Sequence, residues 1–411
     1  MKKNCEVCGN KKLTKILDLG KNPLCDDLIK IGSKKKNNLY KIQILFCKKC
    51  LTGFQKYEVR KKDLFPKSYH YRARFTNDVL KGFKEIIKSS KNILKNLKNK
   101  TILDIGCNDG SLLNYFKKNG AKTVGVEPTN AGLEAKKNGH FIYQKYFDDD
   151  VSSKIKKKYK KVDLIIFTNV FAHIENLNLL ISNLKKIIDQ NTFLLIENHY
   201  FGAILKKRQF DTFYHEHPRT YSATSFIEIA KKLDMTIDKI EFPKRYGGNI
   251  RVLFSKKKNK KLKFASIRNR ERSLLKKILQ IQNDVNIWKK NKKNLIKNLN
   301  KKYGPLTAKA FPGRAAILIK LLNLKTKHIE VVHEKNGSMK IGHYVPGTRI
   351  PIKSDFELFK KFKNLKVILN FSWHISKEIK NYLRNNGYKG KIYNILENKD
   401  FTKRRSKHKL I

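Results

Sequence analysis

The segment 100–139 constrains the fold of this chain more than any other part of the sequence. Its apolar run TILDI leads into a glycine turn, GCNDGS, and a helical pattern, SLLNYFKK, before a second apolar run, KTVGVE, ends at Glu127. A strand, a helix and a second strand in this order predict a βαβ unit. Two further strand-like runs, at 162–169 and 193–198, have a helical pattern between them. We therefore expect an α/β fold with a parallel, doubly wound sheet, whose ligands bind at the carboxyl ends of the strands.

The glycine turn indicates which ligand this sheet binds. Asp104, Gly106 and Gly110 form the pattern DxGxxxG, which lacks the middle glycine of a dinucleotide fingerprint, so a pyrophosphate is not the expected ligand. The pattern resembles the first motif of class I methyltransferases, which bind S-adenosylmethionine (SAM). This resemblance implies that Glu127 binds the ribose of SAM and that the turn from Gly106 to Gly110 holds its amino-acid end.

Titratable side chains are concentrated after two later strands of the predicted sheet. Asn169 and His173, in NVFAHI, follow the run 162–169, and we place them among the cofactor-binding residues; an ordinary histidine at a helix start is the alternative for His173. The segment FDTFYHEHPRTYS (210–222) follows the next run and enters the same crevice. A histidine that titrates near neutrality is suited to remove a proton, and a tyrosine hydroxyl can donate a hydrogen bond to an enolate oxygen. A polar loop packed on the sheet edge is the alternative for this segment.

Four cysteines predict a metal site near the N-terminus. Cys5 and Cys8 form CEVC, and Cys47 and Cys50 form CKKC. Each pair can present two thiolates to one ion from a tight turn, and two pairs complete a closed, structural zinc site. Four unrelated buried thiols and a redox CxxC are the alternatives. Cys25 has no partner at this spacing, so we interpret it as a packing residue.

The sequence as a whole resembles the deoxysugar C-methyltransferases, enzymes that act on nucleotide-linked 4-keto sugars. The two CxxC pairs, LDIGCNDGSLL, GVEPT, NVFAHI, FDTFYHEH, GGNIRV and YVPGTRIPI occur in the family's order. The resemblance implies a zinc-binding domain, a SAM domain and a C-terminal Rossmann-like domain that helps to hold the sugar nucleotide. It also places the catalytic base on His217, with Tyr214 and Glu216 in the site.

The family has another active-site tyrosine where this chain has SYHYRARF, and of Tyr69 and Tyr71 we favour Tyr71. One departure from the family pattern concerns the residues near the sugar. The family usually has HGGS where this chain has YGGN, beginning at Tyr246, so the identity of the sugar is left open.

Length and composition set the limits of the molecule. With 411 residues, two or three domains are expected, and we divide the chain into a zinc-binding domain (1–65), a SAM domain (66–256), a helical linker (257–302) and a C-terminal α/β domain (303–411). Apolar residues from Leu274 to Leu299 recur mostly every three or four positions, which predicts a long amphipathic helix in the linker. No apolar run reaches the length of a membrane span, so a cytoplasmic protein is expected.

The net charge of +59 suggests a polyanionic partner at first sight, but the lysines are spread through every segment instead of clustering. From the resemblance we predict a SAM-dependent C-methyltransferase, a monomer or homodimer, that methylates a nucleotide-linked keto sugar beside its ketone through an enolate. A sugar O-methyltransferase is one alternative. A zinc-containing nucleic-acid-binding protein or RNA methyltransferase is another.

Overall fold

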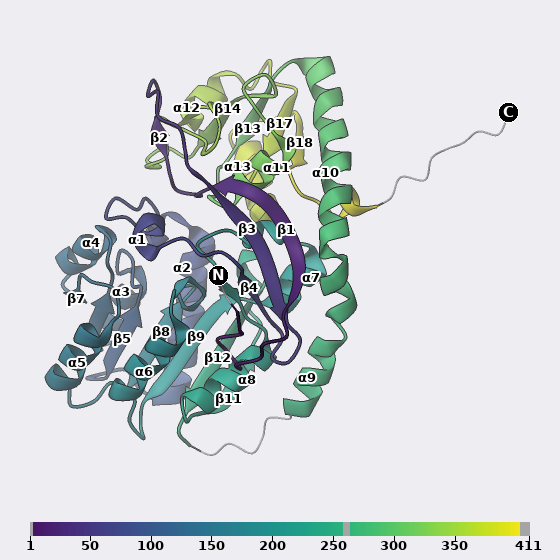
Figure 1. The fold of residues 1–411 in the computed structure, drawn as a ribbon. Helices are drawn as coiled ribbons and strands as arrows, with labels where there is room; N and C mark the ends of the chain where they lie inside the picture. Colours follow the sequence, from purple (N-terminus) through teal and green to yellow (C-terminus); the bar gives the residue numbers. More distant parts are fainter. Residues whose placement is uncertain (1–2, 258–263, 403–411) are drawn as a thin grey trace. The chain divides into compact units, whose positions relative to one another are not determined.

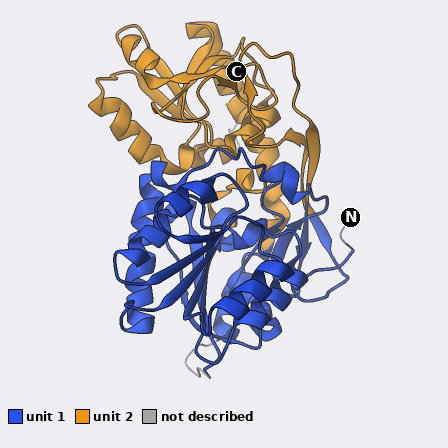
Figure 2. Ribbon diagram, turned by 90° about the vertical axis from the view of Figure 1, so that its left-hand side faces the viewer, with its two compact units in different colours: residues 1–15, 44–204, 215–275 blue, residues 16–43, 205–214, 276–411 orange. Residues whose placement is uncertain are grey.

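The computed structural model describes residues 3–257 and 264–402, which form two compact units (Figure 2). The first unit comprises residues 1–15, 44–204 and 215–275, and the second comprises 16–43, 205–214 and 276–411. Residues 258–263 of the predicted linker and 403–411 of the predicted C-terminal domain lie outside the described residues. The domain limits drawn at 65, 256 and 302 stay predictions, because these units group the chain by contacts and not along the sequence.

The first unit contains a seven-stranded sheet in the order β11-β12-β9-β8-β5-β6-β7. β12 runs antiparallel to both of its neighbours, and the other pairs are parallel. The predicted parallel, doubly wound sheet is thereby confirmed. Its strands are β5 (Thr101–Ile105), β6 (Lys122–Val126), β7 (Phe141–Tyr143), β8 (Leu164–Thr168), β9 (Phe193–His199), β11 (Thr236–Glu241) and β12 (Asn249–Ser255).

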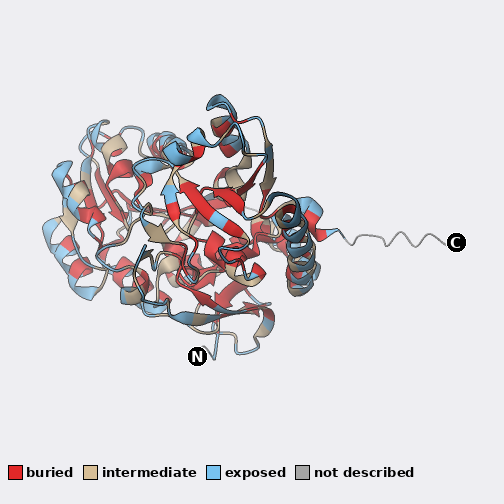
Figure 3. Ribbon diagram, turned by 90° about the horizontal axis from the view of Figure 1, so that it is seen from above, coloured by how far each residue is buried: buried red, intermediate tan, exposed pale blue. Residues whose placement is uncertain are grey.

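Helices cover both faces of this sheet (Figure 1). Because side chains alternate along a strand, Ile102 packs with residues of α2 and α3, whereas Leu103 packs with residues of α5, α6 and α8. Burial on both faces explains why these strands read as continuous apolar runs (Figure 3). The helices of this unit are α1 (Lys61–Leu64), α2 (Asn77–Leu94), α3 (Ser111–Lys117), α4 (Ala131–Lys137), α5 (Asp149–Lys158), α6 (Leu177–Ile187), α8 (Ala223–Lys232) and α9 (Phe264–Arg272).

A four-stranded sheet in the order β1-β3-β4-β10 carries the N-terminal part of the chain. Its last pair joins Arg219 of β10 to Phe54 of β4, so the strand that follows the YHEH segment is paired with the strand that follows the second CxxC. This pairing fixes the far end of the YHEH segment. The strands are β1 (Thr14–Pro23), β3 (Leu39–Cys47), β4 (Thr52–Gln55) and β10 (Arg219–Thr220), and α7 spans Phe201–Lys207.

The second unit contains a parallel five-stranded sheet in the order β16-β14-β13-β17-β18. This confirms the predicted C-terminal Rossmann-like fold. The elements are β13 (Leu306–Lys309), β14 (Ile329–Glu334), β16 (Ile352–Ser354), β17 (Val367–Asn370), β18 (Lys391–Asn394), α11 (Ala315–Leu322), α12 (Asp355–Lys360), α13 (Ser376–Asn385) and a separate pair, β2 (Ile29–Lys30) with β15 (His343–Tyr344).

The predicted amphipathic helix is α10 (Leu275–Tyr303), and most of the apolar residues that predict it are buried. Trp288, near its middle, is fully buried and donates from Nε1 to the carbonyl of Ile395, 3.0 Å away.

Within the described ranges, no helix combines the length and the apolar character that crossing a bilayer requires.

Candidate active site

The four predicted metal ligands lie together. The Sγ atoms of Cys5 and Cys50 are 3.5 Å apart, as are those of Cys8 and Cys47, and all four sulfurs lie within 4.8 Å of one another. Four thiolates around one zinc, each about 2.3 Å from the ion, give sulfur separations of this size. Asn10 Nδ2 donates to Cys47 Sγ at 3.4 Å, and hydrogen bonds from Cys5 and Cys50 lower the pKa of the Cys47 thiol. The residues therefore fit a tetrahedral zinc ion.

The predicted glycine turn has a backbone that requires glycine. Gly106 and Gly110 have φ values of 76° and 75°, a region that side chains disfavour. A Cβ on Gly106 would also lie 2.5 Å from Val170 Cγ2, and one on Gly110 would lie 2.9 Å from Ala135 Cβ. Both glycines thus keep the backbone close to its surroundings at the carboxyl end of β5.

Two buried carboxyl groups face this turn. Asp104 is 3% exposed, and its Oδ1 has no hydrogen-bond partner among the described residues. Burial, and secondarily the charge of Glu127, raises the pKa of Asp104 to about 8. A buried carboxyl oxygen without a partner is costly, and a cationic ligand would satisfy it. Asp104 therefore fits the ammonium group of SAM.

Glu127 directly follows β6 and is buried. It accepts hydrogen bonds from Asn108 N at 3.0 Å, from Thr129 N at 3.0 Å and from Thr129 Oγ1 at 2.7 Å. A carboxylate offers about four acceptor positions, so these three bonds orient the group and leave room for a ribose hydroxyl. The pair of acids fits the cofactor predicted from the sequence.

Three histidine rings form a row beside the cofactor residues. His217 is 4% exposed, and its ring centroid lies 5.1 Å from that of His173 and 5.2 Å from that of His199. The ring of Phe65 stacks on His173 at 5.1 Å and 16°. Burial lowers the pKa of His173 to about 4, so this ring is neutral at physiological pH. The structure thus brings His173 to the predicted base.

The two candidate tyrosines of SYHYRARF are both in this region, with different partners. Tyr69 donates its hydroxyl to Oε2 of the buried Glu216 at 3.0 Å. The hydroxyl of Tyr71 lies 3.3 Å from that of Tyr246. Tyr214 is half-buried and belongs to the segment 205–214 of the second unit.

A buried ion-pair network was not predicted from the sequence. Glu197, fully buried in β9, accepts from Arg245 Nε, from Arg251 Nε at 2.7 Å and from Asn249 Nδ2 at 2.9 Å. Burial alone would raise the pKa of Glu197, but the two guanidinium groups outweigh it and hold the pKa below its usual range. Asn249 also donates to Oδ1 of the predicted Asn169 at 3.2 Å.

Two residues whose rings belong to the row of aromatic rings around His217, His199 and Tyr246, were not predicted from the sequence. His199 lies two positions beyond Glu197 on the same strand, so it shares a face with that residue. The position of ENH at the carboxyl end of a predicted strand was a signal for it. Tyr246 was noticed only as a departure from a family pattern.

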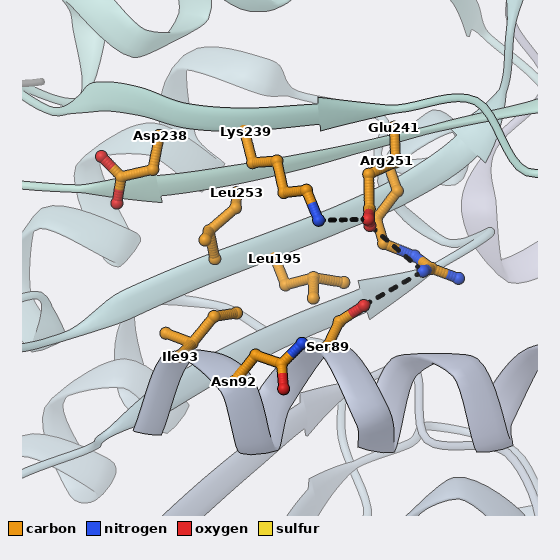
Figure 4. Close-up of a pocket in the computed structure, with 9 residues that line it drawn as sticks. All are labelled: Ser89, Asn92, Ile93, Leu195, Asp238, Lys239, Glu241, Arg251 and Leu253. Carbon is orange, nitrogen blue, oxygen red and sulfur yellow. Dashed lines mark hydrogen bonds and ion pairs between the residues drawn. The ribbon is translucent and has the colours of Figure 1, made fainter. Parts of the chain in front are cut away.

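A cavity of about 280 Å³ has none of the three histidines in its lining. Leu195 and Leu253 contribute its apolar wall, and Arg251 and Glu241 lie at one end (Figure 4). None of the predicted catalytic or cofactor-binding residues lines it. The predicted site is therefore the carboxyl edge of the sheet and not this cavity.

Three protein-family models match the chain. The model described as a putative zinc binding domain matches residues 5–65, a methyltransferase domain matches residues 78–240, and a C-methyltransferase C-terminal domain matches residues 244–393. These matches follow one another along the chain.

Individual proteins are similar over parts of the chain. The C-methyltransferase NovU of Streptomyces niveus is 22% identical over 252 residues, which cover 60% of this chain and 59%, less than two thirds, of that protein. The ubiquinone biosynthesis O-methyltransferase of Pelagibacter ubique is 29% identical over 200 residues, covering 44% of this chain and 77% of that protein. The crystal structure of a magnesium protoporphyrin IX methyltransferase from Synechocystis PCC 6803 with bound SAM matches with a TM-score of 0.37 and 13% identity, covering 49% of this chain and 100% of that chain.

Proposed function

Because the chain belongs to the family of C-methyltransferases that join a zinc-binding domain, a methyltransferase domain and a C-methyltransferase C-terminal domain, we propose that it methylates a nucleotide-linked keto sugar at the carbon next to the ketone. The predicted family, the class I methyltransferase fold, the methyltransferase class and the cofactors SAM and zinc are confirmed by these matches and by the cysteine cluster. The sugar substrate and the roles of individual residues are proposals.

The observation that carries the proposal is the buried His217 between two histidine rings, next to the cofactor residues. Methylation of carbon requires a carbanion, and a neighbouring ketone stabilises it as an enolate. His217 removes the proton from that carbon, and the electron pair of the C–H bond moves onto the ketone oxygen. A neutral His173 puts no second positive charge beside His217 after it takes the proton.

The other residues hold the reactants. Glu216, with Tyr69 on its Oε2, orients the end of the YHEH segment or binds a sugar hydroxyl. Asp104 and Glu127 would hold the ammonium and ribose groups of SAM, and Asn169 stands at the end of the neighbouring strand. When bound there, SAM supplies a methyl group that is already activated for displacement. Tyr214 stays a candidate for the base itself, with His217 as its partner.

A panel experiment tests the substrate. Purified protein is incubated with SAM and several nucleotide-linked 4-keto sugars, and the product is analysed by mass and by the carbon that gains the methyl group. A C-methylated sugar with a free ketone is expected. A panel with no methylated product would overturn the proposal.

O-methylation is the second candidate, because the chain is 29% identical over 200 residues to a ubiquinone biosynthesis O-methyltransferase. In that case His217 would deprotonate a hydroxyl, and the ketone would not be needed. The same panel, extended to sugars without a ketone, distinguishes the two reactions, since a methyl ether would be formed on a hydroxyl oxygen.

A further inference from the structure

Tyr246 has a backbone conformation that costs free energy. Its φ is 54°, and the next two residues, Gly247 and Gly248, also have positive φ values of 84° and 126°. A tyrosine in the left-handed region is rare, and glycine would adopt it with less strain. Such a residue persists where the surrounding structure holds it, and these positions cluster at functional sites. The side chain of Tyr246 is therefore the feature to explain.

The turn that carries Tyr246 is held from both sides. Arg245 before it and Asn249 after it both donate to the buried carboxylate of Glu197. Gly82 of α2 leaves the space that the Arg245 guanidinium fills, since a Cβ on Gly82 would lie 1.9 Å from Arg245 Nη1. Tyr246 N also donates to Asp78 Oδ2 at 3.2 Å. These contacts over-determine the turn, so the Tyr246 ring has a fixed direction.

That direction leads to the catalytic group. The Tyr246 ring lies 5.7 Å from the ring of His199, which lies 5.2 Å from that of His217. The hydroxyl of Tyr246 is 3.3 Å from that of Tyr71. In such a pair one phenol donates to the other, and the second keeps its proton for another acceptor. Hydrogen bonds in a chain polarise one another and strengthen the outer donor.

The side chain of Tyr71 is 37% exposed and that of Tyr246 is half-buried, but desolvation raises the pKa of Tyr71, although its bond with Tyr246 opposes this, and raises that of Tyr246 well above its ordinary value. Both phenols thus stay protonated at neutral pH. A paired donor of this kind suits an acceptor oxygen that gains negative charge during a reaction.

We propose that Tyr246, coupled to Tyr71, is a further catalytic residue, which donates a hydrogen bond to the ketone oxygen of the substrate. The inference rests on the proposed function. In the reaction, the C–H bond breaks, the proton goes to His217 and the electron pair gives the enolate, whose oxygen accepts from the phenol pair. The phenols keep their own protons. The enolate carbon then forms the new bond to the methyl group of SAM, whose sulfonium becomes a neutral thioether.

The test compares Tyr246→Phe, Tyr71→Phe and the double variant with wild type. Each single variant should lower kcat for methylation by about 10²-fold, the effect of removing one such donor, and the double variant should lose less than the product of both effects. Exchange of the substrate's α-proton in D2O should slow in parallel. SAM affinity should not change, because Asp104 and Glu127 are intact.

Three arms keep the test decisive. Tyr159→Phe, which removes a phenol hydroxyl beside Phe141 at the β7 edge, should behave as wild type. Tyr246→His keeps a donor and should recover part of the activity, which a loss caused only by misfolding would not do. Wild-type methylation together with a Tyr246→Phe kcat within twofold of it overturns this inference alone. A wild type that methylates no keto sugar overturns the proposed function, and this inference with it.

Discussion

At the scale of single residues, the site depends on buried groups whose protonation states burial has changed. The pKa of His173 is lowered and the pKa of Asp104 is raised. Both shifts have the same physical cause, because burial favours the neutral form of each side chain. His217 lies beside the neutral ring of His173, and Asp104 is the residue that we assign to the ammonium group of SAM. These two residues give separate predictions for proton removal and for SAM binding.

His217→Ala should reduce turnover by about 10²–10⁴-fold, the usual contribution of a general base. Solvent exchange of the α-proton, measured with an unreactive SAM analogue in D2O, should fall with it, while SAM affinity stays near normal. Tyr214→Phe should have a milder effect if Tyr214 only supports the reaction, and a comparable effect if it is the base. Near-normal turnover of His217→Ala would remove the histidine from the mechanism.

Asp104→Asn should weaken SAM binding and change how stability depends on pH. The unfolded chain releases this proton near pH 4, whereas the folded protein without SAM keeps it up to about pH 8. The folded state binds more protons between these values, so its free energy of unfolding falls as pH rises through that window and then levels off. Asp104→Asn should remove that part of the slope, which urea titrations between pH 5 and 9 measure.

Asp163→Asn is the matched control. Asp163 accepts from Thr101 N at 2.9 Å, at the amino end of β5 and away from the glycine turn. It should lower stability but leave SAM affinity unchanged in calorimetry. Wild-type SAM affinity in Asp104→Asn would contradict the assignment of Asp104.

At the scale of elements, the carboxyl end of β9 and the amino end of its antiparallel neighbour β12 build the frame of the proposed site. Arg251 pairs across the strands with Glu197, and Asn249 with His199. Since all four residues lie on one face of the sheet, one buried carboxylate ties the two strands together and holds the turn before β12. The side chains on this face of the sheet therefore stabilise the two strands and also position the turn of the proposed site.

Glu197→Ala should therefore be strongly destabilising, because it leaves two buried guanidinium groups without their carboxylate. We expect a loss of about 3–5 kcal/mol in the free energy of unfolding, measured by urea denaturation. Glu241→Ala is the control. Glu241 pairs with Arg251 at 3.3 Å but is partly exposed, so its loss should cost about 1 kcal/mol or less. Equal effects of the two variants would contradict the role of Glu197.

The elements also show what sequence patterns can predict. The strands, the glycine turn and the cysteine pairs follow from local rules of spacing and backbone geometry, and the structure contains all of them. The network of Glu197 joins residues from β9, β12 and the preceding turn, which no local pattern connects. Tyr246 needs both that network and a positive φ, so its place beside Tyr71 could not be read from the sequence.

At the scale of the molecule, the net charge of +59 has no counterpart in the chemistry of the site. If the charge serves only solvation, methyl transfer should change little with ionic strength. A nucleic-acid substrate would instead give binding that falls steeply with salt. Measuring turnover of the keto sugar and binding of duplex RNA at about 50 and 200 mM salt, the range over which such contacts lose most affinity, separates these cases.

The zinc cluster is part of the same core as the methyltransferase sheet. Cys5, Cys47 and Cys50 belong to the apolar cluster that contains residues of α8. Ser222 and Ser225, which cap the start of α8, both donate to the carbonyl of Cys50, at 3.3 and 3.2 Å. Because β4, which follows the cluster, pairs with β10 after the YHEH segment, the metal supports the elements that position His217 without touching the reactants.

Zinc removal should therefore destabilise the first unit and lower activity indirectly. Purified protein should contain about one equivalent of zinc, the content of one closed four-cysteine site, and Cys5→Ser should contain less and unfold at a lower temperature. Cys25→Ser, which removes a buried thiol outside the cluster, should keep the full zinc content. The residual activity of Cys5→Ser below its unfolding temperature should show an unchanged pH profile, since no reacting group is altered. Metal-free wild type with full thermal stability would contradict the structural role of the ion, because four cysteine sulfurs within 4.8 Å of one another, three of them on buried residues, need a cation to balance their charge as thiolates.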